Sequence, residues 1–466
     1  MRAILAAGIA AILAIPALAQ DRAGEPAFRA LYKELVETNT TLSAGDCTKA
    51  ATQVAARLKA AGFADSDLTI FSVPEKPKEG GLVAIFPGTS KTLKPILLLA
   101  HIDVVEAKRE DWTRDPFTLI EEGGYFYARG VADDKAMAAI FADSLIRWKS
   151  AKSRFKRTLK LALTCGEETN NAFNGAEWLS TNRRQLIDAQ YALNEGGGGR
   201  LKADGTPLLL ALQVGEKAST NYTLEVTNPG GHSSMPRADN AIYTLARAVE
   251  KVEAFHFPTS LNDTTRAQMA RLAPVIGGPA GDAMRTILAT PDDPAANALL
   301  RRDPLINSTL RTTCVATLLN AGHAENALPQ RARANINCRI FPGQTIEQTQ
   351  ATLAKLIDDP LVTITPRGAR GPIAQPPALD PRIVGPMEAL AQKMFPGVAF
   401  VPIVSTGATD AIFLAAAGIP TYGVPGILFD QDGGGVHGLN ERIRVKSVLD
   451  GRDYLHTLVA TLADSQ

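Results

Sequence analysis

Short apolar runs that stop at polar, metal-binding side chains are the main pattern in the first half of the chain. The run at residues 95–100 leads to His101 and Asp103, residues 159–165 to Glu167 and Glu168, and residues 189–194 to Glu195. Runs of this length and composition are typical of strands in a buried parallel sheet. Because ligands bind at the carboxyl ends of strands in open α/β sheets, we expect these side chains to share one sheet edge.

A pair of carboxylates extends this pattern. Asp133 and Asp134 stand directly before residues 135–148, which show the three- and four-residue apolar spacing of an amphipathic helix. Taken alone, the pair fits a helix amino-terminal cap. Together with one histidine and the carboxylates after the strands, it predicts a divalent-metal site.

The order of predicted elements changes twice along the chain. Strands alternate with helices up to about residue 215, which predicts an α/β domain with a mostly parallel central sheet covered by helices. From 216 the order is strand, helix, two strands, helix, strand, which is typical of a small α+β sandwich. Its expected strands and helices are at residues 221–227, 241–254, 308–319, 331–340, 345–357 and 362–365.

The α/β order resumes after the second change, so the α+β unit is inserted within the α/β domain. The predicted organisation is a signal peptide at 1–19, an α/β domain at 20–215 and 371–466, and an inserted α+β domain at 216–370. Within the inserted domain, residues 256–303 are rich in Pro, Asp and Ala and are expected to form short helices.

Composition narrows the class of protein. The 466 residues carry a formal net charge of +1, so no nucleic-acid or membrane-surface partner is implied. Arg2, an apolar stretch at 3–18 and the small-x-small sequence at 17–19 predict a signal peptide cut after Ala19. The exported chain is then periplasmic or secreted; an uncleaved membrane anchor is the alternative.

The four cysteines have two interpretations. Buried thiols are favoured, because the spacing of Cys47, Cys165, Cys314 and Cys338 matches no zinc motif. Disulfides are the alternative in an oxidising compartment, and Cys314 and Cys338 lie in two strand-like runs that can be neighbours.

Nine short motifs spread over nearly the whole mature chain resemble one enzyme family. They are AHIDVV at 100–105, ARGVADDK at 128–135, CGEE at 165–168, NEGG at 194–197, GGHSSMP at 230–236, ENALP at 325–329, CRIFPG at 338–343, STGATDA at 405–411 and HGLNE at 437–441. The chain resembles the dizinc exopeptidases and deacylases that include glutamate carboxypeptidase, carboxypeptidase S, aminoacylase, carnosinase and succinyl-diaminopimelate desuccinylase. Any one motif is weak, but nine in the family's order are specific.

The resemblance implies a role for each polar residue near the predicted site. Asp133 would bridge two metal ions, with Asp134 as the alternative bridge. The remaining ligands would be His101 and Glu195 for one ion, and Glu168 and His437 for the other. A His and carboxylate set suits zinc, with manganese or cobalt as alternatives. Asp103 would orient the imidazole of His101, and Glu167 would act as general base and acid.

The resemblance also assigns residues outside the metal site. It implies that the α/β domain is catalytic and that the inserted domain at 216–370 is a lid or dimerisation domain. His232 would reach the active site of a partner subunit from this lid, with a simple turn at a domain edge as the alternative interpretation. Asn326 and Arg339 would bind substrate from the lid, and a guanidinium suits a substrate carboxylate. Gly407 and Thr409 would line the pocket.

These residues predict an exported, zinc-dependent hydrolase, dimeric through its lid, that cleaves the amide bond of short peptides or N-acyl amino acids. The carboxypeptidase, dipeptidase or deacylase type is favoured. An aminopeptidase of the same family, a non-catalytic periplasmic peptide-binding protein and a dimetal phosphoesterase are the alternatives. An intact Glu167 argues against pure binding, and no basic cluster for phosphate accompanies the ligand motifs.

Overall fold

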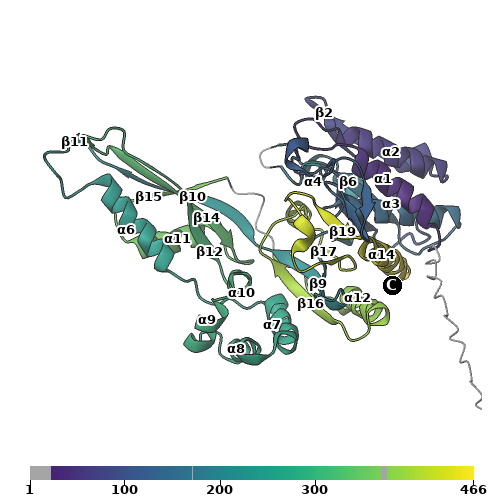
Figure 1. The fold of residues 1–466 in the computed structure, drawn as a ribbon. Coiled ribbons are helices and arrows are strands. Elements are labelled where there is room, and N and C mark those ends of the chain that lie inside the picture. The colour runs from purple at the N-terminus through teal and green to yellow at the C-terminus, as the bar shows by residue number, and fades with distance from the viewer. Residues whose placement is uncertain (1–21, 170–171, 369–374, 466) are drawn as a thin grey trace, which may run out of the picture.

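The computed structural model describes residues 22–169, 172–368 and 375–465. The predicted signal peptide, its cleavage position after Ala19, and the domain boundary at 370/371 lie outside the described residues. Figure 1 shows a catalytic part with a large sheet and an elongated arm, the lid, that projects from it.

A ten-stranded sheet forms the centre of the catalytic part, in the order β1-β2-β6-β3-β7-β17-β9-β8-β18, with β16 paired to β9. The three strands predicted to end at ligands lie side by side and parallel. The strands are β1 (Leu68–Val73), β2 (Lys76–Phe86), β3 (Ile96–His101), β6 (Leu159–Thr164), β7 (Tyr191–Asn194), β8 (Gly198–Leu201), β9 (Pro207–Glu216), β16 (Ala399–Ser405), β17 (Thr421–Gly423) and β18 (Leu428–Phe429). The predicted α/β class is therefore confirmed.

Helices cover both faces of this sheet. Along β3, Ile96 and Leu98 pack into one core, whereas Leu97 and Leu99 pack into a second core on the opposite face. Burial on both faces explains why the strand is an unbroken apolar run rather than an alternating one. The covering helices are α1 (Glu25–Glu37), α2 (Cys47–Ala60), α3 (Lys135–Ser150), α12 (Pro381–Met394) and α14 (Val445–Asp464) on one face, and α4 (Gly175–Asn182), α5 (Arg184–Ile187) and α13 (Ala411–Ala416) on the other.

The lid contains a four-stranded sheet in the order β12-β14-β10-β15. Its strands are β10 (Ala218–Thr227), β12 (Thr313–Ala321), β14 (Arg331–Ile340) and β15 (Thr363–Arg367), and its helices are α6 (Ala241–Ala254) and α11 (Ile346–Ile357). Tyr222, Leu245, Ile336 and Leu353 form the core between helices and sheet.

The strand predicted at 308–319 begins later than expected, at Thr313. Residues 304–309 instead form the helix α10 (Pro304–Thr309). Asp303 caps this helix, because its carboxylate accepts from the N–H groups of Leu305 and Ile306, and Pro304 occupies the first helical turn. These start signals outweigh the apolar alternation read from the sequence.

Residues 263–309 form a helical insert of α7 (Asp263–Ile276), α8 (Gly278–Ala289), α9 (Pro294–Leu300) and α10. The insert has its own core, which includes Met269, Met284 and Leu300. It is also bonded to the catalytic part: Arg271 pairs with Glu388 at 2.8 Å and donates to the Phe400 carbonyl of β16 at 3.0 Å. The insert therefore links the lid to one strand of the catalytic sheet.

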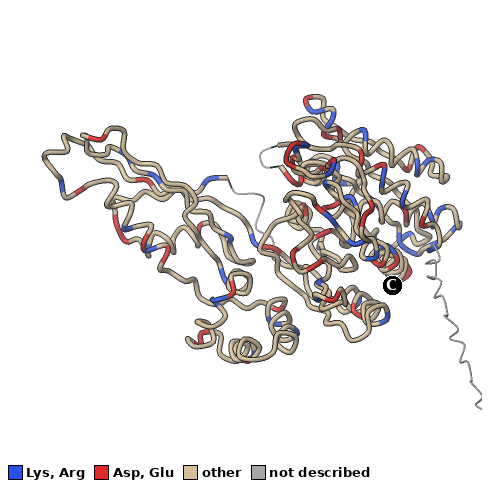
Figure 2. Tube along the Cα trace, viewed as in Figure 1, with Lys and Arg blue, Asp and Glu red and all other residues tan. Residues whose placement is uncertain are grey.

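Two small sheets and the charge distribution complete the fold. The small sheets are β4 (Ile120–Glu122), β5 (Tyr125–Tyr127) and β19 (Arg442–Arg444) in the catalytic part, and β11 (Gly231–His232) and β13 (Ala327–Leu328) in the lid. Figure 2 shows acidic and basic residues interspersed along both parts. None of the described helices combines the length and apolarity needed to cross a membrane.

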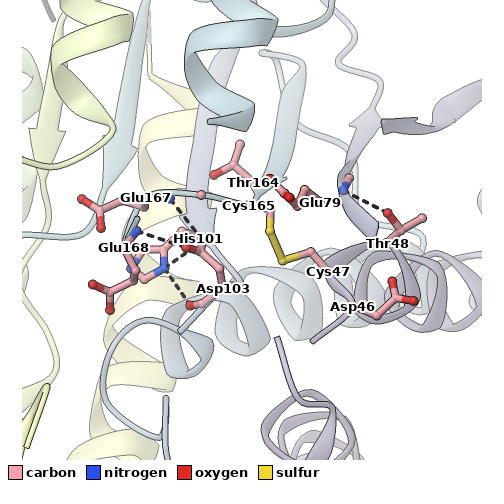
Figure 3. The surroundings of a disulfide bond; sticks show 12 residues. Asp46, Cys47, Thr48, Glu79, His101, Asp103, Thr164, Cys165, Glu167 and Glu168 are labelled. Atoms are coloured by element: carbon pink, nitrogen blue, oxygen red, sulfur yellow. Dashed lines mark hydrogen bonds and ion pairs between the residues drawn. A yellow bond between two sulfur atoms is a disulfide. The ribbon is translucent and has the colours of Figure 1, made fainter. Parts of the chain in front are cut away.

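All four cysteines form disulfides, so the interpretation as buried thiols is wrong. Cys314 and Cys338 are paired directly across β12 and β14, with Cα atoms 4.1 Å apart. Cys47 at the start of α2 bonds to Cys165 at the end of β6, with Cα atoms 6.1 Å apart (Figure 3). Folding brings Cys47 and Cys165 together although 118 residues separate them in the sequence, and their spacing alone does not reveal this contact.

Candidate active site

The five predicted metal ligands converge at the carboxyl ends of the parallel strands. His101 ends β3, Glu168 follows β6 and Glu195 follows β7, whereas Asp133 precedes α3 and His437 lies in the loop before β19. The geometry arises because parallel strands present their carboxyl ends at one edge.

Asp133 lies between two groups of ligands. One oxygen, Oδ1, is 3.0 Å from His101 Nε2, and this nitrogen is 3.7 Å from Glu195 Oε1. The other oxygen, Oδ2, is 3.1 Å from His437 Nε2, which is 2.9 Å from Glu168 Oε2. Two triads thus share one carboxylate, which is the arrangement that a bridging ligand requires.

Asp134, the alternative bridge, is buried and occupies the N-cap position of α3 without a side-chain cap bond. Among the described residues its Oδ2 has no hydrogen-bond partner. Its carboxylate is not bonded to either histidine in this way, so the geometry favours Asp133 as the shared ligand.

The charges of the site suit divalent cations. Burial raises the pKa of Glu195, and the carboxylates of Asp133 and Glu168 add to this effect. Hydrogen bonds to Asp133 and Glu168 raise the pKa of His437 to about 10. A metal ion would relieve the repulsion between the carboxylates and take the place of the imidazole proton. The nitrogen and oxygen donors, without thiolate, fit zinc, manganese or cobalt.

Asp103 supports both the first histidine and the loop that carries Glu167 and Glu168. His101 Nδ1 is 3.1 Å from the backbone carbonyl of Asp103 and 3.6 Å from its carboxylate (Figure 3). Because a carbonyl only accepts, Nδ1 carries the proton and Nε2 is left to bind a metal. The Asp103 carboxylate accepts from the backbone N–H groups of Glu167 and Glu168, at 3.3 and 3.0 Å.

Glu167 lies beside the first triad. Its carboxylate, a nitrogen of His101 and the carboxylate of Glu195 offer atoms within 4.8 Å of one another, as do His101, Asp133 and Glu168. Burial, reinforced by the charge of Glu195, raises the pKa of Glu167 well above its ordinary value. A carboxyl group with a raised pKa is suited to taking a proton from water and passing it to a leaving nitrogen. Divalent ions held by the two triads would lower the pKa of a water molecule and polarise a substrate carbonyl.

Two positioning residues were not predicted from the sequence. The buried carboxylate of Glu441 accepts from the N–H groups of Gly130 and Ala132, at 3.1 and 3.0 Å, and from Arg129 at 2.7 Å. Arg129 also donates to the carbonyl of Gly438 at 2.7 Å. This pair fixes the Asp133 loop to the His437 loop. Both residues lie in motifs that the sequence analysis quoted, but neither follows a strand as the ligands do.

The predicted pocket residues differ in their surroundings. Thr409 donates to Glu216 through its N–H and its hydroxyl, at 2.9 and 3.1 Å, and its hydroxyl accepts from Asn194 at 3.1 Å. Burial raises the pKa of Glu216 to about 8. Gly407 is exposed, and its N–H donates to Ser405 Oγ at 3.1 Å. Thr409 thus serves the protein's own network, and only Gly407 presents an open surface.

The lid residues are not brought to the metal site of the same chain. His232 is exposed on β11, which Figure 1 places at the far tip of the lid, and its Nδ1 contacts Ser234 Oγ at 2.8 Å. Asn326 is exposed beside it and accepts from the Ser233 N–H at 3.0 Å. Arg339 is half-buried on β14, opposite Ser219 at the base of the lid.

Several known proteins resemble this chain in sequence or in structure. The sequence profile of Peptidase family M20/M25/M40 matches residues 97–461. The N-fatty-acyl-amino acid synthase/hydrolase PM20D1 of Homo sapiens is 30% identical over 391 residues, covering 81% of this chain and 76% of the relative. The probable carboxypeptidase S-like 2 of Dictyostelium discoideum is 28% identical over 398 residues, covering 81% and 73%. The metallo-carboxypeptidase Sso-CP2 of Sulfolobus solfataricus has a TM-score of 0.67 and 18% identity, covering 94% and 99%.

Proposed function

Because the chain belongs to peptidase family M20/M25/M40, we propose that it is a dizinc hydrolase that cleaves the amide bond of N-acyl amino acids, with short peptides as a second substrate class. The observation that carries this proposal is the position of Asp133 between two His and carboxylate groups, with Glu167 beside them. The names of the human and Dictyostelium relatives support hydrolysis next to an amino acid.

We propose that the substrate must have a free carboxylate. In the resembling family, a glutamate at the position of Glu195 accompanies carboxypeptidases and deacylases. Arg339 supports this reading as the guanidinium that would bind a carboxylate. Amidation of the substrate carboxylate should lower kcat/KM by roughly 10- to 150-fold, the loss expected for one charge-assisted contact. Arg339→Ala should remove the difference between the two forms.

A second copy of the chain is the proposed source of His232. The exposed position of His232 at the lid tip supports action in a partner's site. The edge strand β12 exposes Val315, Leu318 and Leu319, with 57%, 69% and 65% of their surfaces accessible, and such an edge favours pairing between copies. Mixed dimers of His232→Ala and Glu167→Gln subunits should regain activity, because one hybrid site holds both intact residues. No recovery after subunit exchange would exclude this arrangement.

Export remains a proposal that the disulfides support. Two disulfides form among the described cysteines, and such bonds persist in oxidising compartments. The mature chain would begin at Gln20, in the periplasm or outside the cell. Amino-terminal sequencing of the protein recovered from a periplasmic extract and from the medium tests both the cleavage position and the location.

A substrate panel tests the activity. The mature protein with added zinc should cleave N-acyl amino acids, and dipeptides more slowly, and the Glu167→Gln variant should be inactive on both. Cleavage of carboxyl-amidated peptides that requires a free amino terminus would instead identify an aminopeptidase. Hydrolysis restricted to phosphoesters, or binding without turnover, would exclude the proposed reaction.

A further inference from the structure

A cavity of about 680 Å³ extends from the metal site to the helical insert. The metal ligands Asp133 and Glu195 line one end of it. This volume lies within the range of about 300–1,000 Å³ that is typical of small-molecule sites. The cavity therefore has room for a substrate group larger than the scissile amide itself.

Aliphatic side chains from the catalytic sheet form one side of the cavity, and glycines and polar residues form much of the remaining lining. Leu209 and Ala211 of β9 and Val401 and Ile403 of β16 form its sheet side. Polar residues such as Arg200 and Asp432 also line it. A peptide chain placed along this sheet would lose hydrogen bonds to water that aliphatic side chains do not replace.

The opposite side is formed by the helical insert. We name Leu272 and Ile276 of α7 and Leu305 and Ile306 of α10 the insert wall, because all four line the cavity. Ile276 and Leu305 remain 49% and 66% exposed. Large apolar side chains that face an open cavity indicate an apolar occupant rather than packing within the fold.

The insert wall is held at a fixed place on the sheet. Gln268 of α7 accepts from the Val404 N–H at 3.3 Å, and Arg271 bonds to Glu388 and to the Phe400 carbonyl. These contacts join α7 to β16, so both sides of the cavity belong to one packed unit. A fixed wall can limit the length of a ligand that starts at the metal site.

From this continuity we infer that the cavity binds the acyl chain of an N-acyl amino acid and that the insert wall sets the chain length accepted. The inference rests on the proposed function, since it places the scissile amide at the two triads. The occupant is a long unbranched acyl chain, because the sheet side of the cavity and the insert wall that faces it both carry aliphatic side chains. A short acyl group would leave the insert wall uncovered.

A series of N-acyl derivatives of one amino acid, from acetyl upward, tests the inference on the full mature enzyme. In the wild type, kcat/KM should rise about four-fold per added methylene until the cavity is filled, which corresponds to about 0.8 kcal/mol for each buried methylene. The double variant Ile276→Gln/Leu305→Gln should lower kcat/KM for long chains about ten-fold and leave acetyl substrates unchanged.

A matched control is Leu361→Gln, which changes a leucine that is 52% exposed and outside the residues that line the cavity. It should leave the whole series unchanged. Cleavage that does not depend on chain length, or an equal loss for acetyl and long-chain substrates in the double variant, would overturn the acyl site and leave the proposed function standing. Failure of the wild type to cleave any N-acyl amino acid would overturn both.

Discussion

Removal of the disulfide between Cys47 and Cys165 should destabilise the catalytic part more than removal of the second disulfide destabilises the lid. The paired variants Cys47→Ser/Cys165→Ser and Cys314→Ser/Cys338→Ser test this directly. The first disulfide joins α2 to the residue that precedes Gly166 and Glu167, whereas the second joins two adjacent strands of the lid.

The size of each effect follows from the chain length that each bond closes. In the chain-entropy treatment, a disulfide removes about 2.1 + 1.5R ln n cal/mol/K from the unfolded state, where n is the number of residues in the loop. The sequence separations are 118 and 24 residues. The unfolding free energy should therefore fall by roughly 4.9 kcal/mol for the first pair and roughly 3.4 kcal/mol for the second, at 25 °C.

Tryptophan fluorescence distinguishes the two variants. The three tryptophans, Trp112, Trp148 and Trp178, all lie in the catalytic part, so their emission during urea unfolding reports that part alone. The first variant should shift this transition to lower urea. The second variant should shift the urea unfolding transition measured by far-UV circular dichroism, to which the lid contributes. It should leave the fluorescence transition unchanged.

Metal affinity provides a second measurement. Without the disulfide, the hydrogen bonds from the Gly175 N–H to the Cys165 carbonyl and from the Glu168 N–H to the Asp103 carboxylate should still hold the loop from Cys165 to Glu168. The first variant should therefore keep its fold under native conditions but bind metal about 10- to 100-fold more weakly, as is typical when support of a ligand is lost. Equal fluorescence transitions in the two variants, with unchanged metal affinity, would refute the reasoning.

Four further variants test the site and its surroundings. Glu167→Gln should lower kcat about 10²–10⁴-fold with metal content retained, whereas Asp133→Ala should lose both ions by metal analysis. Glu441→Gln should weaken metal binding about 10- to 100-fold in a chelator titration, because Glu441 holds the Asp133 loop; unchanged affinity would exclude this positioning role. Burial and two nearby arginines lower the pKa of His456 from 6.5 to about 4, so the folded state keeps this imidazole neutral while the unfolded state takes up a proton below pH 6.5. That contribution to stability is present above pH 6.5 and is lost as the pH falls toward 4, so urea midpoints should fall less from pH 7 to pH 5 in His456→Gln than in the wild type.

Local sequence patterns predicted the helices and strands whose first and last residues are defined by apolar spacing or by an adjacent capping residue. The helix at 241–254 and the strand at 331–340 have the predicted bounds, because apolar periodicity and an Asn240 cap define the first and strict alternation defines the second. The strand at 308–319 was placed too early, because Asp303 and Pro304 start a helix that the alternation concealed. The sequence therefore predicts the bounds of a helix or strand correctly where its apolar spacing and its capping residues indicate the same element.

The five metal ligands could be predicted from the sequence because each stands at the end of a predicted strand or in a family motif. Glu441 lies in a family motif but does not follow a predicted strand, and the disulfide partner Cys47 lies in no motif. Glu441 meets Ala132 across 309 residues, and Cys47 meets Cys165 across 118. The acyl cavity is hidden for the same reason, since β9, α7, α10 and β16 contribute to it from distant parts of the chain. Long-range packing, rather than local propensity, creates these features.

The place at which the lid is inserted connects the acyl cavity to the metal site. Strand β9 ends at Glu216, whose carboxylate accepts from Thr409, and the chain enters the lid through Lys217. The buried ammonium of Lys217 donates to the carbonyls of Ser308 and Arg311, at 2.9 and 2.8 Å, and thereby joins the lid base to α10. Because α10 carries half of the insert wall, this junction lies beside the far end of the acyl cavity. The end of β9, the base of the lid and one half of the insert wall thus meet at one hydrogen-bonded junction.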